Sequence, residues 1–587
     1  MLDTSRQVLM LDILQTSADV RYLQTSADVR YLQTSADGCQ TIKPELIYPR
    51  TFSMGSNPTL TIDIITEHTT RQTEFDQATM LTPLLVTVTT TVTSWTLATG
   101  VLVLLVVYAW SKTRLKCEGS NIPPFPAPAK PLLGHTLLMK GNILDNFSWM
   151  RKKAGDLFSL NLLGQHWVVV NGYGNLREVL VKHADKTQDR PPDLSSKILG
   201  EDNHGLMSSH GRNWKEQRSI TNSILREFGM GKQIMAEKVL FEVRFFMEKL
   251  ASFKGQAIEL PHIMSAAVCN VVCSITVGHR FDYDDEYYKR MMDNANAFLV
   301  KSPSLYVFYA GTILKRLPGD WFGIKQWENC LSDLNENFCK FQINKVKQDF
   351  SSDNVPESFI AAYLQQMRKK KESEKESYLD EPNLISLIKS LILAGTETSS
   401  TTINWCVLLC LHHPEIQEKV FDEIKTHVGT TRPPCLSDMP NLPYLSAVIR
   451  ETQRFAGIAP VLSRQVTDTF EVQGYLIPKG SRLFLDINSA LHDETTWENP
   501  HQFHPERFLD ASGNLLKPAE FIPFGLGRRV CVGEALARTE LDLFLATMFQ
   551  RFQFEPENPT ELPTLDAVLT LGRSPKPYKV RFLDRNM

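Results

Sequence analysis

The sequence predicts a mainly helical fold with small β-sheets and a single transmembrane helix near the N-terminus. Apolar and amphipathic helical patterns dominate the body of the chain, notably at 235–253, 384–395 and 414–428. Two stretches, 157–172 and 470–486, contain short strand-like runs, the second with Gly and Pro-Lys-Gly turn signals. The segment 77–111 contains no charged residue, which predicts the transmembrane helix.

Composition and charge exclude several classes of protein. The chain has 587 residues, of which 42% are hydrophobic and 22% charged, as in ordinary globular proteins. Lys plus Arg number 63 and Asp plus Glu 66, giving a net charge of -3, so no nucleic-acid partner is expected. The 10 cysteines include no CxxC pair, which argues against a structural zinc site.

Residues 1–80 are expected to form an atypical N-terminal tail. Residues 14–38 hold two copies and a fragment of the nonapeptide LQTSADVRY. So few copies cannot bury the core of a solenoid. We therefore expect a disordered tail or a tandem duplication in the gene sequence.

Residues 81–111 are expected to form the transmembrane anchor. The segment 94–110 is apolar with aromatic residues at both ends, and with the preceding Thr/Val run it reaches the roughly 20 residues that a bilayer requires. Lys112, Arg114 and Lys116 follow at once, which places the C-terminal side in the cytosol. A buried core helix is the alternative. Residues 112–135 form a basic, proline-rich linker, typical of a stiff spacer.

Residues 136–587 are expected to form one domain, because no linker cleanly divides them. The charged stretch 368–377, RKKKESEKES, is expected to be an exposed loop.

The segment 523–541, PFGLGRRVCVGEALARTEL, carries the strongest chemical signal. Cys531 follows a glycine-rich loop and precedes a helical pattern, where the helix dipole and the charges of Arg528 and Arg529 favour a thiolate. Gly525, Gly527 and Gly533 let the backbone pass close to a flat partner. A buried structural cysteine is the alternative for the cysteine taken alone.

The spacing of Phe524, Gly527, Arg529, Cys531 and Gly533 resembles the haem-binding loop of the cytochrome P450 family of haem-thiolate monooxygenases. The resemblance implies the cytochrome P450 fold and haem b as cofactor, with Cys531 as the iron ligand. A thiolate ligand favours O–O cleavage. Phe524 is expected to shield the sulfur, and the other motif residues to bind the cofactor.

Further cofactor-binding residues follow from the same resemblance. Trp214 and Arg218 lie four residues apart, so they share one helix face, and in the family such a pair holds a haem propionate. Arginine suits a carboxylate because its donors form a fork. Arg190 and Arg464 match positions at which microsomal members offer basic residues to the propionates. An ordinary surface face is the alternative for the bare Trp/Arg pair.

The segment 394–399, AGTETS, ends an apolar helical run. The resemblance implies that it crosses the oxygen-binding face of the haem, that Gly395 opens room there, and that Thr398 and Glu397 are catalytic. Thr398 would hydrogen-bond the dioxygen being activated, and Glu397 would join the proton relay. The alternative is a helix whose hydroxyls bond back to its own carbonyls.

Glu451 and Arg454 form the family's E-x-x-R pattern, and HPERF supplies Arg507. The three are expected to form a buried ion-pair network that braces the cysteine loop. Their role would be structural, and breaking the network should be costly.

The resemblance covers residues 115–587 and is greatest to the vertebrate microsomal family-two group. It implies insertion of one oxygen atom of O2 into apolar small molecules, such as xenobiotics, fatty acids or steroids. Electrons would come from NADPH only indirectly, through NADPH-cytochrome P450 reductase, with cytochrome b5 as a further partner. Arg528 and Arg538 would contribute to the reductase dock. We expect the chain in the endoplasmic reticulum membrane, in contact with lipid, with its catalytic domain in the cytosol.

Two rival functions stay open. A haem-thiolate isomerase or dehydratase would rearrange a peroxide without a reductase, although Glu397 and Thr398 argue against it. A non-catalytic haem- or sterol-binding membrane protein would bind haem without consuming NADPH. The substrate is expected to meet the residues before Gly395, the stretch 457–462 and the loop near 570–572, which are mostly apolar.

Overall fold

The computed structural model divides into two units, Met1–Val88 and Thr89–Met587. The predicted tail at 1–80 lies outside the described residues, as do most of the predicted anchor and positions 112–120 of the linker. The structure describes residues 96, 99–101, 103–104, 107–108, 121–191, 203–300, 319–320, 323–348, 355–374, 376–569 and 572–585.

The described residues of the predicted anchor are helical. Their large apolar side chains are exposed, with Val103 59% and Leu104 68% accessible. In the part of the chain that the structure describes, no helix is both long and apolar enough to cross a bilayer. The anchor at 81–111 therefore stays a prediction.

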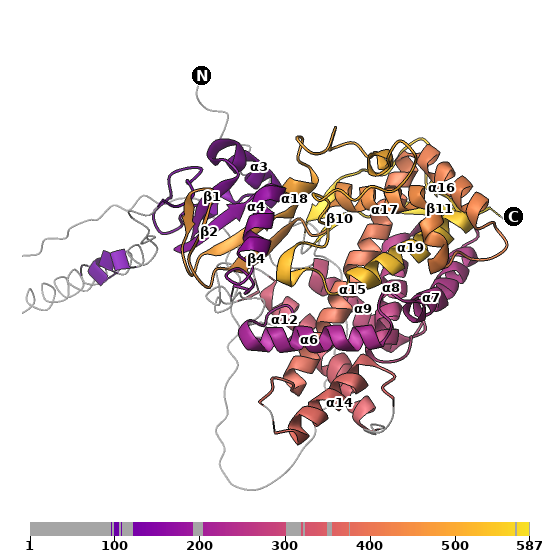
Figure 1. Ribbon diagram of the computed structural model, residues 1–587, viewed down its shortest axis with the longest axis horizontal. Coiled ribbons are helices and arrows are strands. Elements are labelled where there is room, and N and C mark those ends of the chain that lie inside the picture. Colours follow the sequence, from indigo (N-terminus) through magenta and orange to yellow (C-terminus); the bar gives the residue numbers. More distant parts are fainter. Residues whose placement is uncertain are drawn as a thin grey trace, which may run out of the picture. The chain divides into compact units, whose positions relative to one another are not determined.

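Helices make up most of the structure, as the sequence predicts (Figure 1). The longer ones are α3 (Ile143–Ala154), α6 (Gly211–Glu227), α7 (Gln233–Ser252), α8 (Leu260–Thr276), α9 (Glu286–Val300), α12 (Ile324–Asp333), α13 (Phe341–Gln348), α14 (Phe359–Glu372), α15 (Glu381–His412), α16 (Pro414–His427), α17 (Pro443–Ala456) and α19 (Glu534–Arg551). The shorter ones are η1 (Thr136–Leu138), α4 (Tyr173–Arg177), η2 (Glu178–Lys182), η3 (Leu334–Lys340), η4 (Leu436–Asn441), α18 (Ile487–Leu491), η5 (Pro505–Phe508) and η6 (Gly527–Arg529).

The described strands form four small sheets. The largest has the order β1 (Leu157–Leu162), β2 (Gln165–Val170), β7 (Arg482–Asp486) and β4 (Val461–Gln465). The others are β3 (Ile258–Glu259) with β11 (Lys579–Asp584) and β8 (Phe552–Pro556), β9 (Ala567–Leu569) with β10 (Arg573–Pro575), and β5 (Phe470–Val472) with β6 (Tyr475–Ile477). Both stretches predicted as strands are therefore extended, at 157–172 and 470–486.

The largest sheet joins segments that are far apart in the sequence. Strands β2 and β7 pair in parallel, with Trp167 opposite Arg482, so the early strands lie beside the late ones (Figure 1). Beyond the strands, an isolated bridge pairs Asp189 with Gln465. The sheet thereby places the segment after η2 next to β4.

Helix α15 runs through the centre of the helical core. It begins after Asp380, whose carboxylate accepts a hydrogen bond from the Asn383 amide at 2.8 Å, as an N-cap residue does. It packs against α8, α17 and α19. A Cβ on Gly395 would lie 2.9 Å from Val272 Cγ2 of α8, so the room that this glycine opens is used by Val272. The expectation that Gly395 opens room at the site is corrected accordingly.

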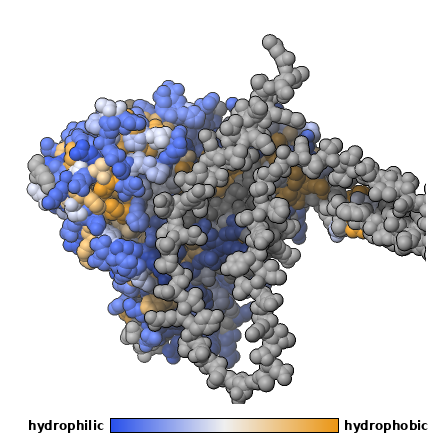
Figure 2. All heavy atoms as spheres, turned by 180° about the vertical axis from the view of Figure 1, so that it is seen from behind, coloured by the Kyte–Doolittle hydropathy of each residue, from blue (hydrophilic) through white to orange (hydrophobic). Residues whose placement is uncertain are grey.

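The expected loop at 368–377 is partly wrong, because 368–372 form the end of α14. Arg368 donates to Glu372 at 2.8 Å, four residues on, and such pairs support a helix. The charged side chains are largely exposed, as predicted. The face of the molecule in Figure 2 is likewise mostly hydrophilic, with scattered hydrophobic groups, which is normal for a folded domain.

Candidate functional site

The loop that carries Cys531 is a tight structure between η6 and the start of α19. The Cys531 amide donates to the Phe524 carbonyl at 3.1 Å, which closes the loop on itself. Gly525 and Gly527 have φ angles of +77° and +74°, a region that side chains disfavour. Cys531 is accessible to solvent, although enough protein surrounds its sulfur to desolvate the thiolate.

Gly527 is required by the protein's own backbone. A Cβ at this position would lie 2.0 Å from the carbonyl oxygen of Leu180 in η2, well inside van der Waals contact. The close neighbour of Gly527 in this direction is another chain segment, and that the glycines also admit a flat partner stays a prediction. At Gly533 a Cβ would lie 3.9 Å from the Cys531 sulfur, so that glycine borders the thiol.

The electrostatics at Cys531 differ from the expectation. Burial raises the pKa of the thiol, and the amides of Gly533 and Glu534 and the charge of Arg218 oppose that rise. The favourable cation is therefore Arg218 of α6. Arg529 instead donates to the carbonyls of Gln188, Leu206 and Ser209 at 2.8, 2.9 and 2.6 Å.

Four arginines that the sequence singled out converge on one place. Burial lowers the pKa of Arg464, and the positive charges of Arg190, Arg529 and Arg218 lower it further. Burial and the charge of Arg190 lower the pKa of Arg529 to about 9. Trp214 lies among them, with its ring 4.0 Å from the Arg529 guanidinium carbon.

This cluster of arginines and Trp214 contains buried hydrogen-bond donors. Arg464 is 1% exposed and Trp214 is 4% exposed. Within the described residues, Nε of Arg464 and Nε1 of Trp214 have no hydrogen-bond partner. Buried polar groups in native proteins are nearly always paired, and like charges repel. The cluster is therefore built to receive an anionic group with several acceptor oxygens.

Thr398 and Glu397 lie near the middle of α15. Thr398 and Ala394, one turn apart, are exposed although most of the helix is buried, so this face is not packed against protein. The Thr398 hydroxyl donates to the Ala394 carbonyl at 2.8 Å, which is the back-bonding that the alternative interpretation described. Glu397 accepts from Thr401 at 3.2 Å and from Ser574 at 3.3 Å, and burial raises its pKa.

Glu451, Arg454 and Arg507 form one buried ion-pair network. Arg454 donates to both carboxylate oxygens of Glu451, at 2.7 and 2.8 Å, and Arg507 adds a third contact at 3.1 Å. Glu451 and Arg454 are completely buried. Arg454 also donates to the carbonyls of Leu491 and Pro500, which precede the Cys531 loop in the chain. That the network braces that loop stays a prediction.

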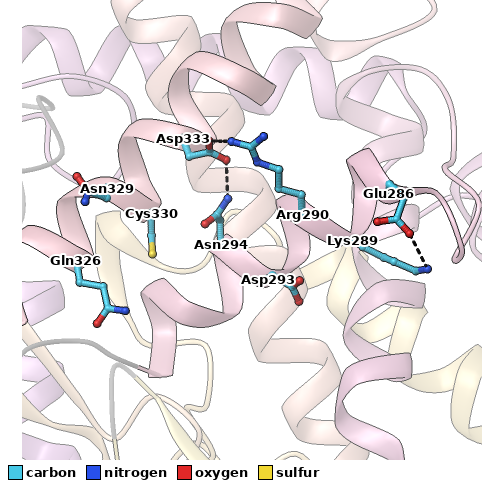
Figure 3. A pocket seen from close by; sticks show the side chains of 9 residues that line it. All are labelled: Glu286, Lys289, Arg290, Asp293, Asn294, Gln326, Asn329, Cys330 and Asp333. Carbon is cyan, nitrogen blue, oxygen red and sulfur yellow. Dashed lines mark hydrogen bonds and ion pairs between the residues drawn. The ribbon is translucent and has the colours of Figure 1, made fainter. Parts of the chain in front are cut away.

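A separate cavity lies between α9 and α12, with a volume of about 500 Å³ (Figure 3). Asp333 accepts hydrogen bonds there from Arg290 and Asn294. None of the residues that line it is a predicted site residue: Glu286, Lys289, Arg290, Asp293, Asn294, Gln326, Asn329, Cys330 and Asp333. Its lining is mostly charged and amide groups, which does not suit an apolar substrate.

Comparisons with known proteins identify the family. The family model described as Cytochrome P450 matches residues 123–582. The chain belongs to the cytochrome P450 family. It is 37% identical to Cytochrome P450 2D10 of Mus musculus over 78% of this chain and 92% of that protein. It is 36% identical to Cytochrome P450 2D6 of Homo sapiens, over 78% of this chain and 93% of that protein. These relatives place it in the microsomal family-two group.

Membership makes the chain a haem-dependent monooxygenase of the P450 family, as the resemblance implied. The residues present fit haem b. An exposed thiol at a helix start suits an iron ligand, and the arginine cluster with its spare donors suits the two propionates. The unpacked face of α15 at Ala394 and Thr398 offers space beside a flat macrocycle.

Three polar residues near α15 were missed by the sequence analysis. Ser574 of β10 donates to Glu397, and Ser399 donates to Glu540 of α19 at 2.6 Å. Both contacts join segments more than 140 residues apart. An acid within the apolar pattern of 534–551 was the available signal for Glu540, whereas nothing in the sequence points to Ser574.

Proposed function

We propose that the chain is a membrane-anchored monooxygenase that inserts one oxygen atom of O2 into apolar small molecules. The observation that carries this proposal is the arginine and tryptophan cluster with buried spare donors, next to the exposed Cys531 thiol. Haem bound there supplies the oxygen-activating chemistry, and Cys531 is the iron ligand. Arg190, Arg218, Arg464 and Trp214 hold the propionates.

Within this proposal, Thr398 and Glu397 manage protons. With haem bound to supply the oxygen chemistry, the Thr398 hydroxyl would be available as a hydrogen-bond donor at the site, because it lies on the exposed face of α15, where it donates to the Ala394 carbonyl. Burial raises the pKa of Glu397, which favours the neutral form of its carboxyl group as a proton donor. Thr401 and Ser574 orient that carboxyl group, so it delivers the proton from one fixed side.

The substrate enters from the side formed by 457–462 and the residues that follow the predicted loop at 570–572. The Arg573 amide donates to the Ile458 carbonyl at 2.9 Å, which holds these two segments together. Thr570 and Leu571 lie outside the described residues. Ile458 and Leu462 are apolar and partly buried, which favours an apolar xenobiotic, fatty acid or steroid.

Electrons come from NADPH through NADPH-cytochrome P450 reductase, with cytochrome b5 as a further donor. Arg528 is exposed. Arg538 lies 5.0 Å from the Phe524 ring and pairs with Glu534 at 2.8 Å. These cations border the Cys531 loop and suit an acidic partner. The exposed apolar helical residues Val101, Val103, Leu104 and Val107 support an anchor in the endoplasmic reticulum membrane, with the catalytic domain in the cytosol.

The test is the difference spectrum of the reduced, carbon-monoxide-bound protein, with Cys531→Ala beside the wild type. We expect a strongly red-shifted Soret band in the wild type and its loss in the variant. An unshifted band in the wild type would contradict the thiolate ligand. Oxygen insertion with NADPH and reductase then separates this function from its rivals, since a peroxide isomerase needs no reductase and a binding protein consumes no NADPH.

A further inference from the structure

Glu540 is an acid of α19 buried against α15. It is 1% exposed, and its Oε2 accepts a hydrogen bond from the Ser399 hydroxyl at 2.6 Å. Ser399 is 2% exposed and directly follows Thr398. The contact therefore connects the helix that begins just after the thiolate loop with the helix that carries the proposed oxygen-side hydroxyl.

Ser399 differs from its neighbours on α15 in where its hydroxyl points. Thr398, Ser400 and Thr402 each donate to a carbonyl four residues earlier in the same helix, at 2.8, 2.7 and 2.7 Å. Such bonds satisfy the hydroxyl within its own helix, although Ser400 also accepts a hydrogen bond from Ser265 of α8 at 3.2 Å. The Ser399 hydroxyl instead reaches across to α19, so this contact fixes the relative position of the two helices.

Glu540 is held in its neutral form. Burial raises its pKa from 4.5 to about 8, opposed only in part by the Ser399 bond. Among the described residues its Oε1 has no hydrogen-bond partner. A carboxylate in that position would be an unpaired buried charge, which is far costlier than a neutral acid. The carboxyl group of Glu540 is therefore mainly neutral at neutral pH, and its contact with α15 is a hydrogen bond.

We propose that Glu540, as a neutral acid bonded to Ser399, is a positioning residue for the monooxygenase reaction. It holds α15 at Thr398 in fixed register with α19, and so sets the placement of the Thr398 hydroxyl relative to the thiolate side of the cofactor. This inference rests on the role proposed for Thr398 above. Glu540 itself touches neither substrate nor cofactor in this scheme.

The experiment compares Glu540→Gln, Glu540→Leu and Ser399→Ala in the full-length haem-loaded protein. The readout is the product formed per NADPH oxidised, together with hydrogen peroxide released. Glutamine keeps the shape and the hydrogen bond of a neutral acid, so it should match the wild type. Leucine and alanine should lower the yield of product per NADPH by about three- to tenfold, because small misplacements near reacting atoms are costly.

Thr402→Val is the matched control, since it removes a neighbouring α15 hydroxyl whose hydrogen bond goes to the carbonyl of Thr398 in the same helix. It should leave the coupling unchanged. Haem content and the carbon monoxide difference spectrum show whether each variant folds and binds its cofactor. Other buried acids such as Glu397 also have raised pKa values, so the neutral acid is read from the infrared difference spectrum: the wild type minus Glu540→Gln should show one protonated-carboxyl band, and this readout does not depend on turnover.

Equal uncoupling in Glu540→Gln and Glu540→Leu would overturn the inference, since the acid's proton and not its shape would then be needed. Absence of the infrared band would also overturn it. Thr398→Ala separates this result from the proposed function. If Thr398→Ala uncouples turnover and Glu540→Leu does not, the positioning role alone fails. If neither variant uncouples, the role of Thr398 fails and takes this inference with it.

Discussion

Two completely buried arginines should respond in opposite ways to the same substitution. Arg464 is 1% exposed and Arg454 is fully buried. Arg454 is bonded to both oxygens of Glu451 and to two carbonyls. For Arg464, the surrounding charges are the three positive ones of its cluster, and Nη1 donates to the Ser463 carbonyl at 2.7 Å. We therefore predict that Arg464→Met leaves the haem-free protein as stable as before or more so, while Arg454→Met destabilises it.

The magnitudes follow from how well each charge is compensated. Replacing a buried, poorly compensated charge by an apolar group of similar size is neutral or stabilises by about 1–4 kcal/mol, whereas breaking a buried pair costs about 3–5 kcal/mol. In the haem-loaded protein, on the proposed assignment, Arg464 would pair with a propionate. Removing one partner of such a pair costs about 2–4 kcal/mol, which corresponds to about 30- to 700-fold weaker haem binding.

The assay is urea unfolding of the haem-free protein, with haem affinity measured separately by transfer to a competing acceptor protein. Arg464→Met should keep or raise the free energy of unfolding and weaken haem binding. Arg454→Met should lower that free energy. If Arg464→Met destabilises the haem-free protein as much as Arg454→Met does, then Arg464 is part of the folded core, and its assignment to the propionates is refuted.

Three further predictions concern the cysteine loop, α19 and the reductase. Gly527→Ala should lower the free energy of unfolding by about 2 kcal/mol or more in urea, because the position has a positive φ and a Cβ there would collide with the Leu180 carbonyl. Gly533→Ala, whose Cβ would meet no such carbonyl, should not lower it. The pKa of Glu540 is about 8 in the folded state against 4.5 in the unfolded state, so its contribution to stability is full below pH 4.5 and is lost as the pH rises to 8. Glu540→Gln should therefore reduce the fall in the free energy of unfolding between pH 4.5 and 8. An unchanged pH dependence in that variant would contradict the prediction. Arg538→Glu should raise the reductase concentration needed for half-maximal turnover, and equal turnover at limiting reductase would count against the dock.

The mainly helical fold with small sheets and the family could both be predicted from the sequence alone, and so could most of the residues proposed for the site. Spacing carries that information where the chemistry lies within one loop or one helical turn, as at Cys531 or in the pair Glu451 and Arg454. Helix and strand stretches were also predictable, since hydrophobic periodicity records which face is buried. The charged end of α14 was not predicted as helix, because a run of charged residues is equally well solvated in a helix and in a loop.

The tertiary structure decided which groups meet. It made Arg218 the cation at the thiol, turned Arg529 toward backbone carbonyls, and placed Leu180 against Gly527. It also brought Glu540 to Ser399, across 141 residues of sequence. A local pattern specifies what a side chain is able to do, but contacts between distant segments depend on how helices and sheets pack. Partners, charge states and close approaches are therefore properties of the fold and not of any motif.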